Sequence, residues 1–472
     1  MSSPIVSVAS NTSAGAAGGS VINVSSLVSQ LVQATEAPQQ SIITQQTQSV
    51  STEISAIGSL KSALSQFQSS LGPIDTPSAF DSLSATSSNT EAFTASADSS
   101  ATLGSYSVSV TQLAQAQQLV SNAFSGGSSA TVGTGTLQLT LGSTSFNITI
   151  NSSNDTLSGI AAAINSASGN PGIEASIITG TTGAHLALTS SLTGASNTIQ
   201  VAETDTGTGL SSLTYSSSNT SNYTQATAAQ DASVTIAGVT YTSASNTVNS
   251  ALSGVTLNLL ATTSSAATLS VADNVSTVVS NIQAFVAGYN SLQSTFSQLG
   301  GYDATTNTAG PLMGNAALST VQNQILSVLD SFVNTGSSTY NSLASVGITA
   351  NSDGSLSVDT TKLTAALNSD FSAVSALFSS SSGIATTFNS QLTSQLASGG
   401  PIDSLSQSLV AQENGLTQQD NQLSQQMSAL SASLTEQYSA LNSLLSSLQS
   451  TSSYLTQAFA TLPGAPGSSS GG

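Results

Sequence analysis

Residues 409–448 read LVAQENGLTQQDNQLSQQMSALSASLTEQYSALNSLLSSL, and the spacing of the apolar residues in this stretch predicts the architecture of the chain. One row of leucines repeats every seven residues from Leu409 to Leu430, and a second row, offset by four, begins at Met427. Two interlocked rows of this kind are the a/d pattern of a coiled coil, although a long core helix of a bundle also fits. Gln and Ser flank the rows instead of Glu and Lys, so charges cannot fix the register of this helix.

The N-terminal part of the chain carries a second helical pattern. Its apolar residues first recur at intervals of three and four, at Val24, Leu27, Val28, Leu31 and Val32. They then recur every seven residues, at Ile43, Val50, Ile57, Leu64 and Leu71. We expect Pro38 to interrupt or kink the helix, because proline lacks the backbone N–H, and Gly72-Pro73 to end it. Since both ends of the chain carry seven-residue repeats, the sequence predicts that the two terminal helices pack together.

Between the two ends, the apolar residues alternate with a period of two. This alternation predicts a β-hairpin over residues 137–150, with its turn at Gly142-Ser143. A short helix over 157–164 follows, and Asn154 or Asp155 can cap it. Further strands are predicted around 106–110, 173–177, 186–188, 199–201, 234–236 and 255–259. After these strands the helical period returns.

These patterns predict an α+β multidomain protein, with helical or coiled-coil legs at both termini, a helical bundle domain and two inserted β-rich domains. The predicted units are a flexible or helical leg over 1–42, the first helix of the helical domain over 43–80, an inner β domain formed by 81–115 and 226–273, an outer β domain inserted at 116–225, the rest of the helical domain over 274–404, a coiled-coil helix over 405–462 and a disordered tail over 463–472.

Charged side chains are almost absent. They make up 5% of the 472 residues, against roughly 25% in a typical soluble domain, and the net charge is −19 because 21 acids face two lysines. Binding of nucleic acids or anionic membranes depends on Lys and Arg, so both functions are excluded, and phosphoryl transfer is disfavoured for the same reason. The chain has no cysteine, which excludes thiol catalysis, disulfides and Cys-based zinc sites. No apolar run is long enough to span a membrane.

The residues that could carry chemistry are few and scattered. Glu203 and Asp205 form the closest acidic pair, but no base or oxyanion donor can be assigned beside them. His185 is the only histidine and cannot build a metal cluster. Residues 351–359 resemble half of a calcium loop but lack its closing Glu, so an Asp-Gly turn between two short strands is the better interpretation. The sequence therefore predicts no catalytic, cofactor-binding or metal-binding residue, and no enzyme.

Several longer stretches carry a recognisable pattern. The most specific are SASNTVNSALSGVTLNLL (243–260) and SLASVGITANSDGSLSVDTTKLTAAL (342–367). Less specific ones are VSSLVSQLVQATEAP (24–38), ISAIGSLKSALSQFQSSL (54–71), GSYSVSVTQLAQAQQLVS (104–121), the helix–Ile-Asn–hairpin module of 156–201 and YSALNSLLSSLQSTSSYL (438–455). Together they resemble the flagellar filament cap family, also called hook-associated protein 2, over nearly the whole chain. The chain departs from the family at Val21-Ile22-Asn23, where Gly-Leu-Asp is usual, and in the few charges of its terminal helices.

The resemblance implies a structural assembly factor without a cofactor. Cap subunits form a homo-oligomeric ring, by default a pentamer, at the distal filament tip, where they retain exported flagellin and promote its folding and insertion. The resemblance also implies contact with the flagellar type III export apparatus and with an export chaperone on the C-terminal helix. The extracellular location agrees with an N-terminus that has no Sec-type signal pattern. Self-assembly and docking on the filament are expected from apolar residues of the terminal helices, namely Leu27, Leu31, Ile57, Leu64, Leu416, Leu423, Met427, Leu430, Leu434, Leu441, Leu448 and Leu455.

Two alternatives share some of these features. Another flagellar axial protein, such as a hook–filament junction protein, would have helical termini and the repeat module but not the stretch GITANSDGSLSVD (347–359). A secreted Ser/Thr-rich adhesin would explain the composition but not the paired terminal repeats. The low content of basic residues also suggests a surface suited to acid, because protonation of the acids would leave the chain only weakly cationic. A compositional bias of the source genome would explain this composition equally well.

Overall fold

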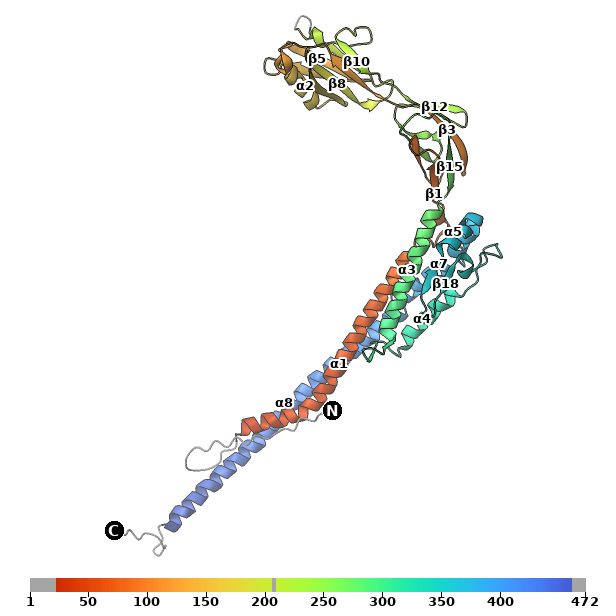
Figure 1. Ribbon diagram of the computed structural model, residues 1–472. Coiled ribbons are helices and arrows are strands. Elements are labelled where there is room, and N and C mark those ends of the chain that lie inside the picture. Colours follow the sequence, from red (N-terminus) through yellow and green to blue (C-terminus); the bar gives the residue numbers. More distant parts are fainter. Residues whose placement is uncertain (1–22, 206–208, 461–472) are drawn as a thin grey trace.

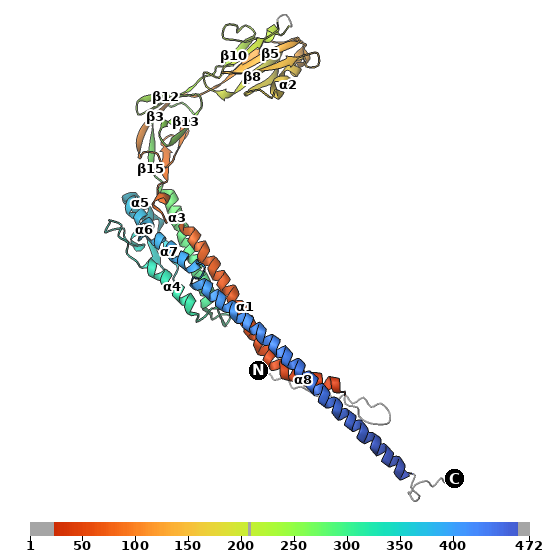
Figure 2. The ribbon, with the colours of Figure 1, turned by 180° about the vertical axis from the view of Figure 1, so that it is seen from behind.

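Two long helices form the axis of an elongated molecule. In the computed structural model, which describes residues 23–205 and 209–460, α1 (Val24–Leu71) and α8 (Pro401–Ala460) lie side by side and run in opposite directions (Figures 1 and 2). Gln40 Nε2 of α1 donates a hydrogen bond to Asp420 Oδ1 of α8 at 2.7 Å. The predicted packing of the terminal helices is therefore confirmed.

The boundaries of these helices correct two details of the sequence analysis. The helix continues through Pro38, so the expected division between a leg and a first helix at residue 42 falls inside α1. Figure 1 shows a bend in α1 instead of a break, as expected when a proline removes one helical hydrogen bond. The C-terminal helix begins at Pro401 and not at 405, because proline is well tolerated in the first turn. The predicted tail and residues 1–22 of the predicted leg lie outside the described residues.

A helical unit surrounds the upper half of α1. Its core contains five rings, Phe67, Phe285, Tyr289, Phe378 and Phe388, with neighbouring centroids 5.3–6.2 Å apart. The other elements of this unit are η1 (Pro77–Phe80), α3 (Val275–Gly300), β16 (Tyr302–Asp303), β17 (Thr308–Ala309), α4 (Ala316–Leu329), η4 (Ala344–Val346), β18 (Ile348–Ala350), β19 (Leu356–Val358), α5 (Thr360–Ser369), α6 (Phe371–Ser379) and α7 (Ile384–Leu396). The lower part of α8 extends well beyond this core (Figure 1).

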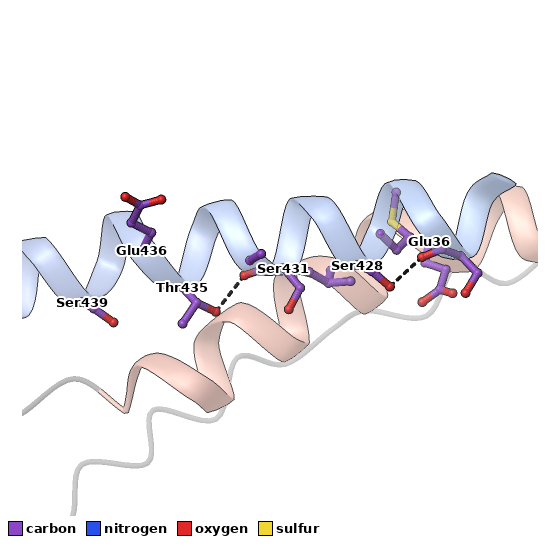
Figure 3. A pocket seen from close by; sticks show the side chains of 10 residues that line it. Glu36, Ser428, Ser431, Thr435, Glu436 and Ser439 are labelled. Atoms are coloured by element: carbon purple, nitrogen blue, oxygen red, sulfur yellow. Dashed lines mark hydrogen bonds between the residues drawn. The ribbon is translucent and has the colours of Figure 1, made fainter. Parts of the chain in front are cut away.

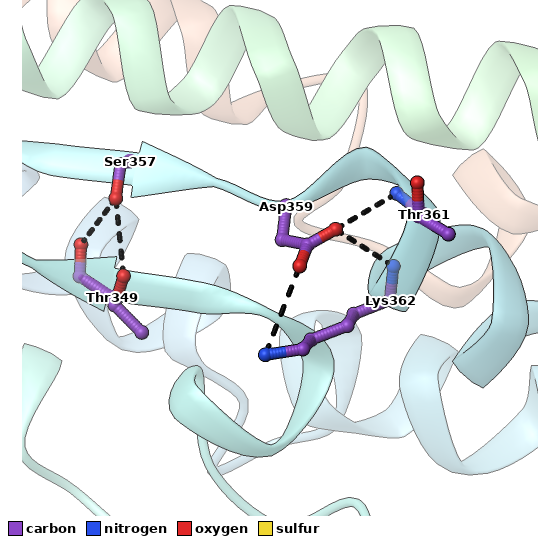
Figure 4. Close-up of polar contacts among 5 residues, drawn as sticks. All are labelled: Thr349, Ser357, Asp359, Thr361 and Lys362. Atoms are coloured by element: carbon purple, nitrogen blue, oxygen red, sulfur yellow. Dashed lines mark hydrogen bonds and ion pairs between the residues drawn. The ribbon is translucent and has the colours of Figure 1, made fainter.

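The Asp-Gly motif forms the hairpin β18–β19, as predicted from the sequence. Gly354 has a φ of +80°, which favours glycine, and Asp353 Oδ1 accepts hydrogen bonds from the backbone N–H and the hydroxyl of Ser355. The next aspartate, Asp359, caps α5 by accepting from the N–H groups of Thr361 and Lys362, and its other oxygen lies 3.7 Å from Lys362 Nζ (Figure 4). Both aspartates therefore have structural roles.

An inner β unit follows the helical unit (Figure 1). Its apolar cluster lies between a five-stranded antiparallel sheet, in the order β1-β15-β3-β11-β12, and a three-stranded sheet, in the order β13-β14-β2. The strands are β1 (Leu83–Ser87), β2 (Phe93–Ala97), β3 (Gly104–Gln112), β11 (Ala232–Ile236), β12 (Val239–Ser243), β13 (Thr247–Leu252), β14 (Val255–Leu259) and β15 (Ala267–Asp273).

An outer β unit is inserted between β3 and β11 and lies at the far end of the molecule (Figure 2). Its core is enclosed by a sheet in the order β10-β4-β8-β7, a sheet in the order β6-β5-β9, and helix α2. The elements are β4 (Ala116–Ser121), η2 (Gly127–Ser129), β5 (Gly135–Leu141), β6 (Thr144–Ile150), α2 (Leu157–Ser166), β7 (Ile173–Gly180), β8 (Gly183–Thr193), β9 (Ile199–Glu203), η3 (Leu210–Leu213) and β10 (Tyr223–Thr227). The predicted hairpin is β5–β6, with Leu141 opposite Thr144. The cap of α2 was wrongly predicted, because Thr156 accepts from the Gly159 N–H.

The inner and outer β units meet in a hydrogen-bonded junction. Thr193 Oγ1 donates to the Ala244 carbonyl at 2.6 Å, and Asp231 Oδ1 accepts from the Ala195 N–H at 2.7 Å. A side chain at Gly194 would meet Ala244, since an added Cβ would lie 2.6 Å from the Ala244 Cβ. This close contact fixes the outer unit against the inner unit.

Asparagine side chains, and not charged groups, form several of the hydrogen bonds that join separate segments of the fold. In each of three pairs, one amide accepts from the N–H of a distant residue and donates to its C=O, as a neighbouring strand would. The pairs are Asn165 with Ala175, Asn246 with Ala114, and Asn290 with Leu356. The Ile-Asn step of the repeat module thus ties α2 to β7.

Replacing Asn165 with Ala should destabilise the outer β unit by about 2–4 kcal/mol, because the amide and carbonyl of the buried Ala175 lose their partners. Urea unfolding of the full chain measures this change. Asn147, which is exposed on β6, supplies the matched control, and its replacement with Ala should stay within about 0.5 kcal/mol. Equal stability of the two variants would contradict the role assigned to Asn165.

Candidate docking site

The lower parts of α1 and α8 form a stalk, defined here as residues 24–49 and 417–460. Val28 of α1 and Leu423 and Met427 of α8 are buried between the two helices. All residues from 443 to 459 are exposed, because α8 continues past the start of α1 (Figure 2). The stalk therefore has a paired part and an unpaired part.

The structure divides the predicted docking residues into three groups. Ile57, Leu64 and Leu416 belong to the core of the helical unit, and Leu423 and Met427 are buried in the α1–α8 contact, so these five do not face outward. Leu430 and Leu434 are half-buried. The exposed predicted residues are Leu27, Leu31, Leu441, Leu448 and Leu455.

Some apolar side chains of the unpaired part are not among the predicted docking residues. Leu444, Leu445, Tyr454 and Phe459 are also 41–72% exposed. With Leu441, Leu448 and Leu455, the residues Leu444, Leu445 and Phe459 form a row along the last five turns of α8, and Tyr454 lies on another face of the helix. Leu445 and Phe459 lie outside the two seven-residue rows, but their spacing of three and four residues from row members could have identified them. Exposed apolar groups in such number on one helix are typical of an interaction surface.

A groove of about 790 Å³ runs along the paired part of the stalk (Figure 3). Val32 and Glu36 line it from α1, and the lining residues of α8 are Ser424, Met427, Ser428, Ser431, Ala432, Thr435, Glu436 and Ser439. Figure 3 shows the side chains of Ser431, Thr435 and Ser439 pointing to the side of α8 along which α1 runs. Glu436 projects from the opposite edge of α8. The groove exists because α8 has mostly short side chains here.

The charges of the stalk are all negative. Its acids are Glu36, Asp420 and Glu436, and its sequence contains no Lys, Arg or His. Of these acids, Asp420 accepts the hydrogen bond from Gln40. The two lysines of the chain belong to the helical unit, where Lys61 lies on α1 and Lys362 on α5. The stalk thus combines an apolar row with side-chain charges of a single, negative sign.

The other polar residues singled out in the sequence lie outside the stalk. Glu203 ends β9 and Asp205 follows it, at the edge of the outer β unit. His185 lies in β8, and its Nδ1 is 2.7 Å from the Ser121 carbonyl. Across residues 23–205 and 209–460, no three His, Cys, Asp or Glu side chains are grouped to hold a metal ion. None of the helices in these ranges is long and apolar enough to cross a membrane.

The pKa values of four aspartates bear on the behaviour in acid. Hydrogen bonds lower three of these pKa values below the ordinary 3.8, chiefly those from Ser100 to Asp98, from Thr306 to Asp303 and from Ser355 to Asp353. Such groups stabilise the fold above their unfolded pKa, and this stabilisation is lost only as the pH falls below about 4. Burial raises the pKa of Asp273, which has the opposite sign and favours the fold in acid.

We therefore expect the chain to keep its fold at pH 4, with a free energy of unfolding close to that at pH 7. Circular dichroism and denaturant unfolding at the two pH values measure this. Loss of structure by pH 4 would contradict the acid tolerance suggested by the composition.

Family comparisons agree with the arrangement of long terminal helices around two inserted β units. The family model described as flagellar hook-associated protein 2 N-terminus matches residues 20–117, and the model of the C-terminus matches 229–450. The flagellin hook IN motif matches residues 136–192. The flagellar hook-associated protein 2 of Escherichia coli strain K12 is 37% identical over 458 residues, which cover 93% of this chain and 97% of that protein. The chain belongs to the flagellar hook-associated protein 2 family.

Other members of the hook-associated protein 2 family are also similar to the chain. The B-type protein of Pseudomonas aeruginosa PAO1 is 31% identical over 71% of this chain and 74% of its own length. The crystal structure of the D1-D2-D3 domains of the flagellar cap protein FliD from Escherichia coli is 38% identical, with a TM-score of 0.59. It covers 75% of this chain and 99% of that one. The predicted family and the predicted α+β multidomain fold are therefore confirmed.

Proposed function

We propose that this chain caps the distal end of the bacterial flagellar filament, where it retains exported flagellin and promotes its folding and insertion at the growing tip. The observation that carries the proposal is the row of exposed apolar side chains on the unpaired end of α8. Exposure of these apolar side chains to water is unfavourable, so the row is suited to contact with another surface in an assembly. The role is structural and needs no catalytic residue or cofactor.

Assembly of the cap requires several copies and a route out of the cell. We propose a homo-oligomeric ring, with a pentamer as the default, and export through the flagellar type III apparatus. A chaperone would cover the exposed row of α8 before export. The three apolar cores support the predicted division into a helical domain, an inner β domain of 81–115 and 226–273, and an outer β domain of 116–225, except that β10 extends the outer domain to Thr227.

Docking would use the exposed members of the predicted set. Leu27 and Leu31 lie on the outer side of α1, and Leu441, Leu448 and Leu455 lie on the unpaired end of α8. The half-buried Leu430 and Leu434 join the two areas. The buried members instead hold the stalk together and keep α8 in position.

A strain without this chain tests the proposal. Its cells should release unpolymerised flagellin into the medium and carry short filaments or none, and expression of the chain should restore normal filaments. Electron microscopy of the cells and quantification of flagellin in the medium provide the two measurements. Normal filaments with lost attachment to surfaces would contradict the proposal and favour an adhesin.

A further inference from the structure

We propose that the groove between α1 and α8 binds a basic helix of a partner protein, and that Glu36 and Glu436 select Lys or Arg residues on that helix. The inference rests on the docking function proposed above and adds the chemistry of the partner. Three features carry it: the shape of the groove, the apolar row that continues it, and the sign of the surrounding charge.

The shape of the groove suits a helix. Its α8 wall repeats short side chains at intervals of three and four residues, at Ser424, Ser428, Ser431, Thr435 and Ser439. Residues at these intervals form one stripe along a helix, and short side chains allow the axis of a second helix to approach closely. The groove therefore offers a place for a third helix beside the α1–α8 pair.

The apolar row supplies the contact beyond the groove. The groove ends at Ser439, and the exposed row begins at Leu441 and runs to Phe459. Leu445 lies 14 residues after Ser431, at the edge of the same stripe, so a helix seated in the groove and extended along α8 would cover Leu445 and lie beside Leu441 and Leu448. This continuity favours an amphipathic helix over an extended peptide, since α8 presents these leucines at helical spacing.

The charges decide what kind of helix binds. In helix pairs, charged residues that flank the apolar contact set the choice of partner. Here Glu36 lies on one wall and Glu436 projects from the edge of α8 (Figure 3). A second copy of this stalk would bring only carboxylates against them, because the stalk contains no Lys, Arg or His. A helix with Lys or Arg would instead find opposite charges.

The test uses the full chain with a single introduced cysteine, S431C, which carries an environment-sensitive fluorophore and is unique because the chain has no other cysteine. Three amphipathic helical peptides of about 20 residues, long enough to fold on binding, share one leucine face and differ only in Lys, Gln or Glu beside it. The Lys peptide should change the fluorescence and bind most tightly. Its affinity should fall as salt is raised from about 0.01 to about 1 M.

Two double variants distinguish the effect of the acids at the groove from the effect of the general negative charge of the chain. E36Q/E436Q should weaken binding of the Lys peptide about five-fold, as expected for the loss of two exposed ion pairs. E91Q/E174Q changes two exposed acids of the β units and alters the net charge equally, and it should leave the affinity unchanged. Equal binding of the three peptides, or equal effects of the two double variants, would overturn the proposal.

A second assay distinguishes this inference from the proposed function. Binding of the wild-type chain to the ends of purified flagellar filaments tests the cap function independently of the peptide-binding measurements. If the chain binds filament ends but binds the Lys, Gln and Glu peptides equally, the inference is overturned and the cap function is left intact. Charge-selective peptide binding without binding to filament ends would support the groove and contradict the cap function.

Discussion

Replacing Leu441, Leu448 and Leu455 with Ser should abolish swimming and release unpolymerised flagellin into the medium. These side chains are 44%, 58% and 49% exposed, so they contribute little to the folded monomer. Each of these leucines buries its apolar surface only in an assembly. Replacing three of them on one helix therefore removes most of the predicted contact. Swimming assays of a complemented deletion strain and flagellin in the medium measure the effect.

A matched triple variant controls for the loss of exposed apolar residues in general. Leu103, Val239 and Leu260 of the inner β unit are 54–71% exposed and lie far from the stalk. Their replacement with Ser should leave swimming intact, and both triple variants should unfold within about 0.5 kcal/mol of the wild type. Normal swimming of the stalk variant would show that the unpaired end of α8 is not the docking surface.

Replacing Phe67 with Ala should destabilise the helical unit by about 3–5 kcal/mol, because a large ring is removed from a closely packed core. Phe67 is fully buried, and its ring centroid lies 5.3 Å from that of Phe388 and 5.9 Å from that of Phe285. The change also removes edge-on ring contacts that add to the burial. Denaturant unfolding, followed by a probe in the helical unit, measures the loss.

Phe332 provides the control for this substitution. Its side chain is 80% exposed, so Phe332→Ala makes the same chemical change without opening a cavity. This variant should unfold within about 0.5 kcal/mol of the wild type. If Phe67→Ala were equally mild, α1 would not be a core helix of the unit, and the anchoring of the stalk would need another explanation.

Periodicity predicted much of this fold, because apolar spacing records which face of an element is buried. The seven-residue rows indicated both long helices and their contact, and the alternation of Leu137, Leu139 and Leu141 indicated the β5–β6 hairpin. The same rows could not indicate where the contact ends. Met427 and Leu448 belong to the same seven-residue row, yet Met427 is buried and Leu448 is exposed, because α8 extends past the first residue of α1.

Other features depend on residues that are distant in the sequence and leave no local signal. Asn246 binds the backbone of Ala114, 132 residues away, and nothing in its immediate sequence distinguishes it from the many exposed asparagines. Ile57 and Leu64 were expected to dock on the filament but lie in the core of the helical unit, because α3 packs against α1. The groove likewise depends on the pairing of two helices whose charges are far apart in the chain.

Electron cryo-microscopy of filament ends with this chain bound tests the central claim most directly. We expect a ring of copies at the distal end, with the β units farthest from the filament and the unpaired end of α8 in contact with flagellin. Copies bound along the sides of the filament, or a ring whose stalks do not touch flagellin, would contradict it.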